Sequence, residues 1–166
     1  VFKNFEIICE AVSKIDKKYK DKFKVLITIR GDENKYTQMI YRNYKNLKNI
    51  KFIGQQTRKK VFEIYSNSDC LIFPSKLETW GLPISEFKLF NKPILAADLP
   101  YAHETIGNYD KVNFFKPDDA HVLSKYIEDY LKGRSIFIRH TLNKRNRSKI
   151  VTWQQLFDFL LKVKTR

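Results

Sequence analysis

Short, nearly continuous apolar runs recur along the chain, and between them lie longer stretches in which apolar residues are spaced three and four apart. The runs fall at residues 24–30, 50–53, 70–73, 93–97 and 112–115. Apolar runs of this length without alternation are typical of strands whose two faces are both covered. The first helical stretch, residues 4–19, has its apolar residues on one side only, which is the pattern of an amphipathic helix.

Local signals indicate further helices after these strands. Thr57 suits the N-cap of one helix, and Pro83 suits the first turn of another that ends near Asn91, a residue that tolerates left-handed backbone at a helix end. Two later helices are expected over residues 118–131 and 152–163. Because strands and helices alternate, the sequence predicts an α/β fold, a doubly wound parallel sheet with helices on both faces.

The predicted order begins with a helix, whereas every later helix follows a strand. If the alternation is continuous, we expect the domain's first strand and its turn to precede Val1. A chain of 166 residues is about one domain long, and no Pro-, Ser- or Gly-rich linker divides it. We therefore interpret residues 1–166 as one domain that is incomplete at its N-terminus.

Charge is the one extreme of the composition. Lys and Arg number 32 against 18 Asp and Glu, a net charge of +14, which suggests nucleic acid, acidic lipid headgroups or phosphorylated small molecules as partners. With 43% hydrophobic and 30% charged residues, the chain is not a disordered or low-complexity one. Cys9 and Cys70 lie in apolar runs, so we expect reduced thiols in a cytoplasmic protein rather than a disulfide.

The most informative stretch is residues 73–86. It reads as a buried strand, a polar loop that contains Glu78 and Gly81, and a helix whose first turn contains Glu86. In open α/β sheets, ligands bind beyond the carboxyl ends of the strands, and the amides of Gly81, Leu82 and Ile84 are expected to point outward there, toward an anion such as a diphosphate.

Two carboxylates beside a phosphate site cannot neutralise it. They can instead accept hydrogen bonds from uncharged hydroxyls, which a sugar-bearing nucleotide supplies on its ribose and on its sugar. The alternative is that Glu78 is a solvated loop residue and Glu86 complements a helix dipole.

The same stretch resembles the C-terminal, donor-binding domain of GT-B fold glycosyltransferases, in particular the retaining enzymes of family 4, the glycosyl transferases group 1. That family carries two Glu separated by seven residues in a run with Pro-Ser and Gly-Leu-Pro. Residues 91–97 are similar to the family's Gly-Lys-Pro-Val turn and strand, with Asn91 in place of Gly. The matching residues are Pro74-Ser75, Glu78, Gly81-Leu82-Pro83 and Glu86, with further similarity at Lys3-Asn4, Phe52-Ile53-Gly54 and Trp153.

The resemblance implies a role for individual residues. Glu86 would bond the ribose hydroxyls of the donor, Glu78 would hold the transferred sugar, and Lys3 would contact the leaving phosphate, so that Glu78 and Lys3 are the candidate catalytic residues. The other donor-binding residues that it implies are Thr79, Trp80, Gly81 and Leu82 in the loop and Ile53, Gly54 and Gln55 in the turn that contacts the base.

The resemblance also implies a reaction. A nucleotide diphosphate sugar would donate its sugar, with retention and without a metal or other cofactor, to a glycan or lipid-linked acceptor in surface polysaccharide or lipopolysaccharide assembly. The acceptor-binding domain of such enzymes is absent from this sequence, so we expect the chain alone to bind the donor but not to catalyse transfer. No Asp-x-Asp motif or His/Cys cluster has the spacing of a metal site.

A glycoside hydrolase is one alternative class of function. It needs one protonated carboxyl, whereas a helix N-terminus at Glu86 favours the ionised form.

The segment 132–149 has seven basic residues and no acidic one. It fits a solvated helix face, a peripheral contact with the anionic inner face of the plasma membrane, or, in a non-catalytic module, nucleic acid. Nucleic acid is the least favoured, because no known nucleic-acid-binding module accompanies the charge.

Overall fold

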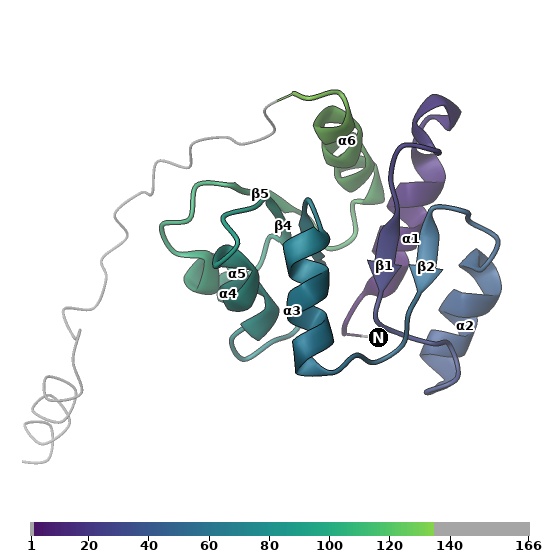
Figure 1. Ribbon diagram of the computed structural model, residues 1–166, viewed down its shortest axis with the longest axis horizontal. Helices are drawn as coiled ribbons and strands as arrows, with labels where there is room; N and C mark the ends of the chain where they lie inside the picture. Colours follow the sequence, from purple (N-terminus) through teal and green to yellow (C-terminus); the bar gives the residue numbers. More distant parts are fainter. Residues whose placement is uncertain (1, 135–166) are drawn as a thin grey trace, which may run out of the picture.

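The strands of this protein form two parallel sheets in the computed structural model, which describes residues 2–134 (Figure 1). In the first sheet β1 (Val25–Ile27) pairs with β2 (Ile50–Phe52), and in the second β4 (Ile94–Ala97) lies between β3 (Leu71–Phe73) and β5 (Val112–Phe115). The parallel α/β architecture is thus confirmed. The pairing differs from the expected single sheet, because β1 and β3 do not pair with each other.

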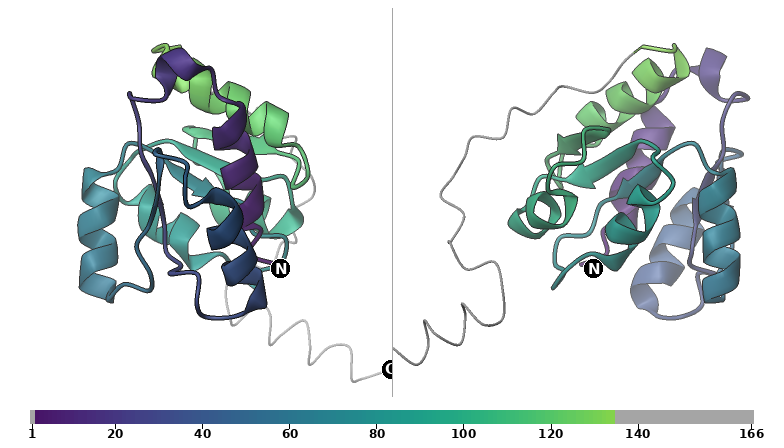
Figure 2. Two further views of the ribbon diagram at one scale, coloured as in Figure 1. Left: turned by 90° about the vertical axis from the view of Figure 1, so that its right-hand side faces the viewer. Right: turned by 60° about the vertical axis from the view of Figure 1, so that its left-hand side comes forward.

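Helices cover both faces of the strands, as expected of a doubly wound fold. Leu95 and Phe115 pack in one apolar core with residues of α1 and α6, while Ile94 and Val112 pack in a second core with residues of α4 and α5. Figure 2 shows α1 and α6 side by side on one face. The helices are α1 (Phe5–Lys14), the 3₁₀ turn η1 (Lys17–Tyr19), α2 (Lys35–Tyr44), α3 (Arg58–Asn67), α4 (Leu82–Lys88), α5 (Pro100–Ile106) and α6 (Ala120–Leu131).

The residues predicted to begin or end helices lie at the expected helix ends. The Thr57 side chain accepts a hydrogen bond from the Lys60 amide at 3.3 Å, Pro83 lies in the first turn of α4, and Asn91 has a left-handed φ of 52°. The first helix is shorter than expected, because Ile15 is extended at its C-terminal end.

The helix α2 was not among the expected ones, although Tyr36, Met39, Ile40 and Tyr44 recur at helical spacing. Its N-terminus carries a second signal. Asn34 accepts a hydrogen bond from the Thr37 amide at 3.0 Å, and the Thr37 hydroxyl accepts one from the Asn34 amide at 3.1 Å, which together form a capping box.

Both cysteines are free thiols, and burial raises the pKa of each to about 12. Within residues 2–134, none of the helices is both long enough and apolar enough to cross a bilayer. The expected helix at 152–163 and residues 135–149 of the basic segment lie outside the described residues. The two basic residues of that segment that are described are both in ion pairs, Lys132 with Glu128 at 3.2 Å and Arg134 with Asp129 at 3.1 Å.

Candidate functional site

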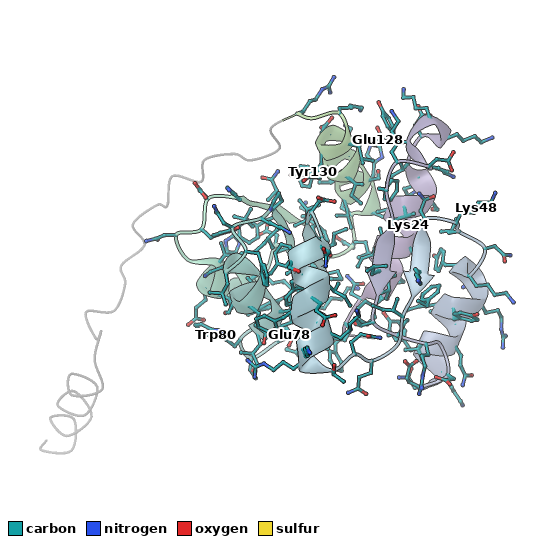
Figure 3. The ribbon with its side chains drawn as sticks, viewed as in Figure 1. Lys24, Lys48, Glu78, Trp80, Glu128 and Tyr130 are labelled. Carbon is teal, nitrogen blue, oxygen red and sulfur yellow. The ribbon has the colours of Figure 1, made fainter. Side chains whose placement is uncertain are left out.

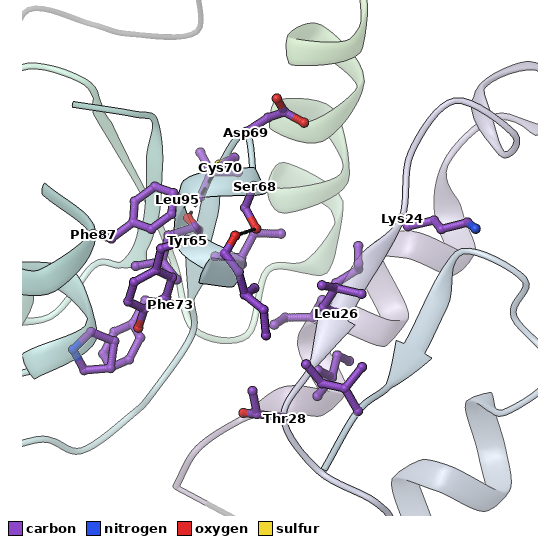
Figure 4. Close-up of a pocket in the computed structure, with 18 of the residues that line it drawn as sticks. Lys24, Leu26, Thr28, Tyr65, Ser68, Asp69, Cys70, Phe73, Phe87 and Leu95 are labelled. Carbon is purple, nitrogen blue, oxygen red and sulfur yellow. Dashed lines mark hydrogen bonds between the residues drawn. The ribbon is translucent and has the colours of Figure 1, made fainter. Parts of the chain in front are cut away.

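A cavity of about 1070 Å³ opens between the two sheets. In Figure 4, Leu26 and Thr28 lie on one side of it, and Tyr65 and Phe73 lie on the other. Its lining is apolar between the strands and polar at both ends. Asp21, Lys24 and Asp69 lie at the amino ends of the strands, and beyond the carboxyl ends Lys3, Gln55, Gln56 and Glu86 contribute side chains. The cavity therefore has a polar mouth at the edge where α/β folds bind ligands.

Glu86 reaches this mouth from α4 and is held from the neighbouring helix α3. The Arg58 guanidinium lies 3.7 Å from the Glu86 carboxylate, whose side chain is 23% exposed. The Tyr65 hydroxyl hydrogen-bonds to the same carboxylate, and burial together with this charge raises the pKa of Tyr65 to about 12. Tyr65 thus stays a hydrogen-bond donor at neutral pH, while its ring packs edge-on against Phe87 at 5.3 Å.

Glu78 and Lys3 meet directly. The Lys3 Nζ atom lies 2.6 Å from Glu78 Oε1, with the lysine side chain 46% exposed and the glutamate 16%. Burial raises the pKa of Tyr101 well above its usual value, and the charge of Glu78 adds to this effect. The two residues that the sequence singles out as catalytic therefore form one ion pair at the edge of the cavity.

Backbone contacts hold Lys3 in this place. The Phe2 carbonyl accepts a hydrogen bond from the Lys76 amide at 2.7 Å. The Asn4 side chain, 1% exposed, donates to the carbonyls of Pro74 at 3.1 Å and Pro117 at 2.8 Å. Asn4 has a left-handed φ of 56°, a conformation that Asn adopts more readily than most residues.

The loop before α4 is held by contacts with α4 and α5. The Trp80 indole N–H donates to Ser85 Oγ at 3.0 Å, and the Thr105 hydroxyl donates to the Trp80 carbonyl. Figure 3 shows Glu78 and Trp80 at one end of the molecule and Glu128 and Tyr130 of α6 at the other. The indole thus lies over the first turn of α4 and stays 45% exposed.

The amides at the start of α4 differ in part from the expectation. Gly81 takes a left-handed φ of 81° just before the helix, and its carbonyl accepts a hydrogen bond from the Ile84 amide at 2.9 Å. The expected free amide of Ile84 is therefore wrong, because the helix itself uses it. Among the described residues, the amides of Gly81 and Leu82 have no acceptor.

The turn after β2 lies on the opposite side of the mouth. Ile53 and Gln55 line the large cavity, and with Gly54 and Arg30 they also line a second one of about 550 Å³. A Cβ atom on Gly54 would lie 2.6 Å from Arg30 Cγ, and Gly54 has a φ of 69°. Glycine thus allows the turn to pass close to Arg30.

The predicted site residues divide into two groups. Lys3, Ile53, Gln55 and Glu86 share the large cavity, and Glu78 joins them through Lys3. The others do not line it: Gly54 lies in the turn after β2, Thr79, Trp80 and Gly81 form the loop before α4, and Leu82 begins α4.

Sequence reasoning missed Arg58, Tyr65 and Arg30. Arg58 and Tyr65 are seven positions apart on α3 and so share one helix face, which was the available signal. Among residues 2–134, no three His, Cys, Asp or Glu side chains form a group that could hold a metal ion.

The parallel strands and the two helical layers define a Rossmann-like α/β domain. Residues 2–149 match the family model of the Glycosyl transferases group 1. The chain belongs to this family.

Two further comparisons agree with the family. Over 100 residues the chain is 27% identical to the serotype-specific mannosyltransferase WbdA of Escherichia coli, a match that covers 60% of this chain and 12% of WbdA. A glycosyltransferase from Rickettsia africae superposes with a TM-score of 0.64 at 25% identity, covering 80% of this chain and 35% of that one. The chain therefore spans only a small part of the curated relatives.

More distant structures share the fold. The sucrose-phosphate synthase of Thermosynechococcus elongatus gives a TM-score of 0.63 at 18% identity over 79% of this chain and 33% of its own. HepE from Anabaena, solved in complex with UDP, gives 0.60 at 19% identity over 81% of this chain and 38% of its own. The architecture is that of the Rossmann-like C-terminal half of GT-B glycosyltransferases.

Proposed function

We propose that this domain binds a nucleotide diphosphate sugar at the polar mouth of the large cavity. The observation that carries the proposal is that Lys3 and Glu86 line one cavity while Glu78 pairs with Lys3. The cation suits a diphosphate, and the two carboxylates suit the hydroxyls on either side of it. The family membership and the UDP complex of HepE support this class of ligand.

Glu86 would bind the ribose. An ionised carboxylate has about four lone-pair directions, and the Tyr65 hydroxyl takes one of them. The remaining acceptors suit two adjacent ribose hydroxyls, and the side chain keeps its orientation because Tyr65 and Arg58 hold it from α3. The turn at Ile53, Gly54 and Gln55 would then contact the base.

Lys3 and Glu78 would act at the bond that breaks. Negative charge grows on the leaving phosphate when the glycosidic bond is cleaved, and a donor that is already in place stabilises that charge more than it stabilises the ground state. The Lys3 ammonium is such a donor, and the amides of Gly81 and Leu82 would add to it. Glu78 would accept hydrogen bonds from the transferred sugar, and Thr79 and Trp80 complete the loop beside it.

The complete reaction would be sugar transfer with retention, as in family 4, without a metal or other cofactor. The acceptor would be a glycan or a lipid-linked glycan in surface polysaccharide or lipopolysaccharide assembly, which the likeness to WbdA supports. A second domain would bind it, so residues 1–166 alone would not catalyse transfer. We place this reaction in the cytoplasm, with the inner face of the plasma membrane as the surface for a lipid-linked acceptor.

A thermal-shift panel of UDP, GDP and ADP tests the proposal. One of these nucleotides should raise the melting temperature, since a ligand at 100 times its Kd stabilises the fold by about 2.7 kcal/mol. Glu86→Gln should abolish the shift, whereas Glu104→Gln, the same charge change at an exposed residue of α5, should keep it. The proposal is wrong if no nucleotide shifts the wild type, or if both variants respond equally.

A further inference from the structure

A strongly basic surface lies at the end of the molecule opposite the mouth of the cavity. The helices α1 and α2 both run from the mouth toward the amino ends of β1 and β2, so residues 14–24 and 45–48, which lead into these two strands, lie together there. Besides two aspartates, these two segments contain eight lysines, namely Lys14, Lys17, Lys18, Lys20, Lys22, Lys24, Lys45 and Lys48. We call this surface the basic face. Figure 3 shows Lys24 and Lys48 on one side of the molecule and Glu78 and Trp80 on the other.

Hydrogen bonds fix the backbone beneath the basic face. The Asn49 side chain, which belongs to a residue that is 4% exposed, donates to the carbonyls of Lys20 and, at 3.0 Å, of Phe23. The Asp16 amide donates to Glu128 Oε1 at 3.0 Å, which joins the same segment to α6. All the lysines of the face except Lys20 are exposed. The face therefore presents solvent-exposed ammonium groups from a fixed frame.

The ring of Tyr19 connects the face to α6. The Nζ atoms around this ring, at 5.1, 5.5 and 5.6 Å from its centroid, belong to Lys18, Lys22 and Lys132. Lys132 is the first residue of the basic segment 132–149, so that segment begins at the basic face.

Most lysines of the basic face have no anionic partner. Lys18 pairs with Asp16 at 3.1 Å, but within residues 2–134 none of the other seven forms an ion pair. The lysines near the amino ends of β4 and β5 differ, because they hold helix ends. Lys88 donates to the Thr105 carbonyl at 2.7 Å, and Lys92 donates to the Ser66 carbonyl at 2.6 Å. The charge of the basic face is therefore not used by the fold and is available to a partner.

The composition of the face favours a lipid surface over nucleic acid. Its cations are all lysines, which are compact point charges, whereas nucleic-acid recognition relies on the planar guanidinium group of arginine and on aromatic side chains that stack on bases. The two aromatic residues of the face, Tyr19 and Phe23, pack against the core instead. Clusters of about four to eight basic residues bind anionic lipid headgroups, so the face has the charge that such a surface requires.

We propose that the basic face docks this domain on a bilayer that contains anionic phospholipid, with the mouth of the cavity turned away from the lipid. The contact belongs to the surface of the folded domain and not to the segment 132–149 alone. A domain of this length is roughly 35 Å across, so the mouth stays open to soluble ligands. The proposal goes beyond the proposed function and holds whichever ligand the mouth binds. If the acceptor is lipid-linked, as proposed above, this orientation brings the mouth to sugars far from the lipid.

Co-sedimentation with vesicles, without any nucleotide, tests the docking. The 166-residue chain should bind vesicles of phosphatidylcholine mixed with phosphatidylglycerol and should not bind phosphatidylcholine alone. Replacing Lys17, Lys45 and Lys48 together by Gln should weaken binding about 100-fold. The matched control replaces three exposed lysines at the mouth end by Gln, namely Lys35, Lys59 and Lys116. Its binding should fall by less than about threefold at 0.1 M salt, because these charges lie beyond the screening length of about 10 Å from the docked surface.

Energy transfer from tryptophan to dansyl-labelled headgroups tests the orientation. The chain has two tryptophans, so Trp153→Phe leaves Trp80 beside the mouth as the single donor. Combining Tyr19→Trp with Trp80→Phe and Trp153→Phe places the single donor in the basic face instead. Transfer should be strong from position 19 and weak from position 80.

Three outcomes would overturn the proposal. The first is vesicle binding that is equal in the wild type and in the variant of the basic face, which would assign the contact to other residues. The second is transfer from position 80 that is as strong as transfer from position 19. The third is tighter binding to a DNA duplex than to the anionic vesicles, with a steep dependence on salt and the same loss in the variant, which would assign the face to nucleic acid.

Discussion

Lys3 and Glu78 are 75 positions apart in the sequence, yet their side chains meet with 2.6 Å between Nζ and Oε1. The pair joins the segment before α1 to the loop after β3. With the lysine side chain 46% exposed, it contributes less than about 1 kcal/mol to the stability of the fold. In the proposed function a diphosphate would share the ammonium of Lys3 with Glu78.

Replacing Lys3 tests this sharing. Lys3→Met should weaken binding of the active nucleoside diphosphate about tenfold, or about 1.4 kcal/mol, and leave binding of the corresponding nucleoside unchanged. Calorimetric titration of both ligands makes the comparison. Lys14→Met, at an exposed lysine in the last turn of α1, is the matched control and should bind both like the wild type. Equal losses for diphosphate and nucleoside would argue against a phosphate contact.

Tyr65 offers a test of how Glu86 is oriented. Tyr65→Phe removes the hydroxyl that bonds this carboxylate, and a hydrogen bond to a charged group is worth about 1.5–3 kcal/mol. We therefore expect nucleotide affinity to fall about tenfold or more. Tyr109→Phe is the matched control, because the Tyr109 hydroxyl donates to the Lys92 carbonyl at 2.5 Å and neither residue lines the large cavity. The affinity of Tyr109→Phe should stay at the wild-type value, and a loss in both variants would mean a general effect on the fold.

The sequence predicts the local features of this protein but not its tertiary contacts. The alternation of elements and the cap at Thr57 are local signals, and both were predicted correctly. The Lys3–Glu78 contact joins distant segments and was not predicted; the family resemblance indicated only that both residues act at the donor. The Tyr65 bond to Glu86 is also a tertiary contact, between α3 and α4, and no local pattern marks it.

The division of the strands into two sheets could not be predicted from the sequence either. The apolar runs at β1 and β3 indicate burial, but which strands pair depends on how the crossovers pack. The helix α2 is a different case, because its capping box at Asn34 and Thr37 is local. Its apolar residues also recur at helical spacing, so both of its signals were present in the sequence.

A side chain at position 81 should destabilise the folded protein. The φ of Gly81, 81°, is left-handed, and a Cβ atom there would meet Ile84 Cδ1 and a Tyr101 ring carbon at 3.4 Å. Gly81→Ala should therefore lower the free energy of unfolding by about 1 kcal/mol, chiefly through backbone strain, and should also weaken nucleotide binding. Gly133→Ala provides the control, since Gly133 has a φ of 69° and nothing within 4 Å of its Cβ position.

Urea unfolding and nucleotide titration of both glycine variants separate these effects. A similar loss of stability with weaker binding only in Gly81→Ala is the expected result. Unchanged binding in Gly81→Ala would remove this loop from the donor site.

Alkaline pH should destabilise the protein, because the folded state keeps buried tyrosine and cysteine side chains in their neutral, protonated form. Burial raises the pKa of Tyr65 and Tyr109 from 10.0 to about 12, and that of the Cys9 and Cys70 thiols from 9.0 to about 12. Because each folded pKa lies above the unfolded value, unfolding releases protons in this window. The stabilisation is complete below the unfolded pKa and is lost as the pH rises through the folded one.

The free energy of unfolding should thus fall by at least about 1 kcal/mol per pH unit between pH 10 and 12. Urea titrations with a reducing agent at a series of pH values measure the fall. Tyr65→Phe should have a shallower slope, because one of these groups is gone. A free energy of unfolding that stays constant to pH 11 would show that these side chains are accessible to solvent in the folded protein.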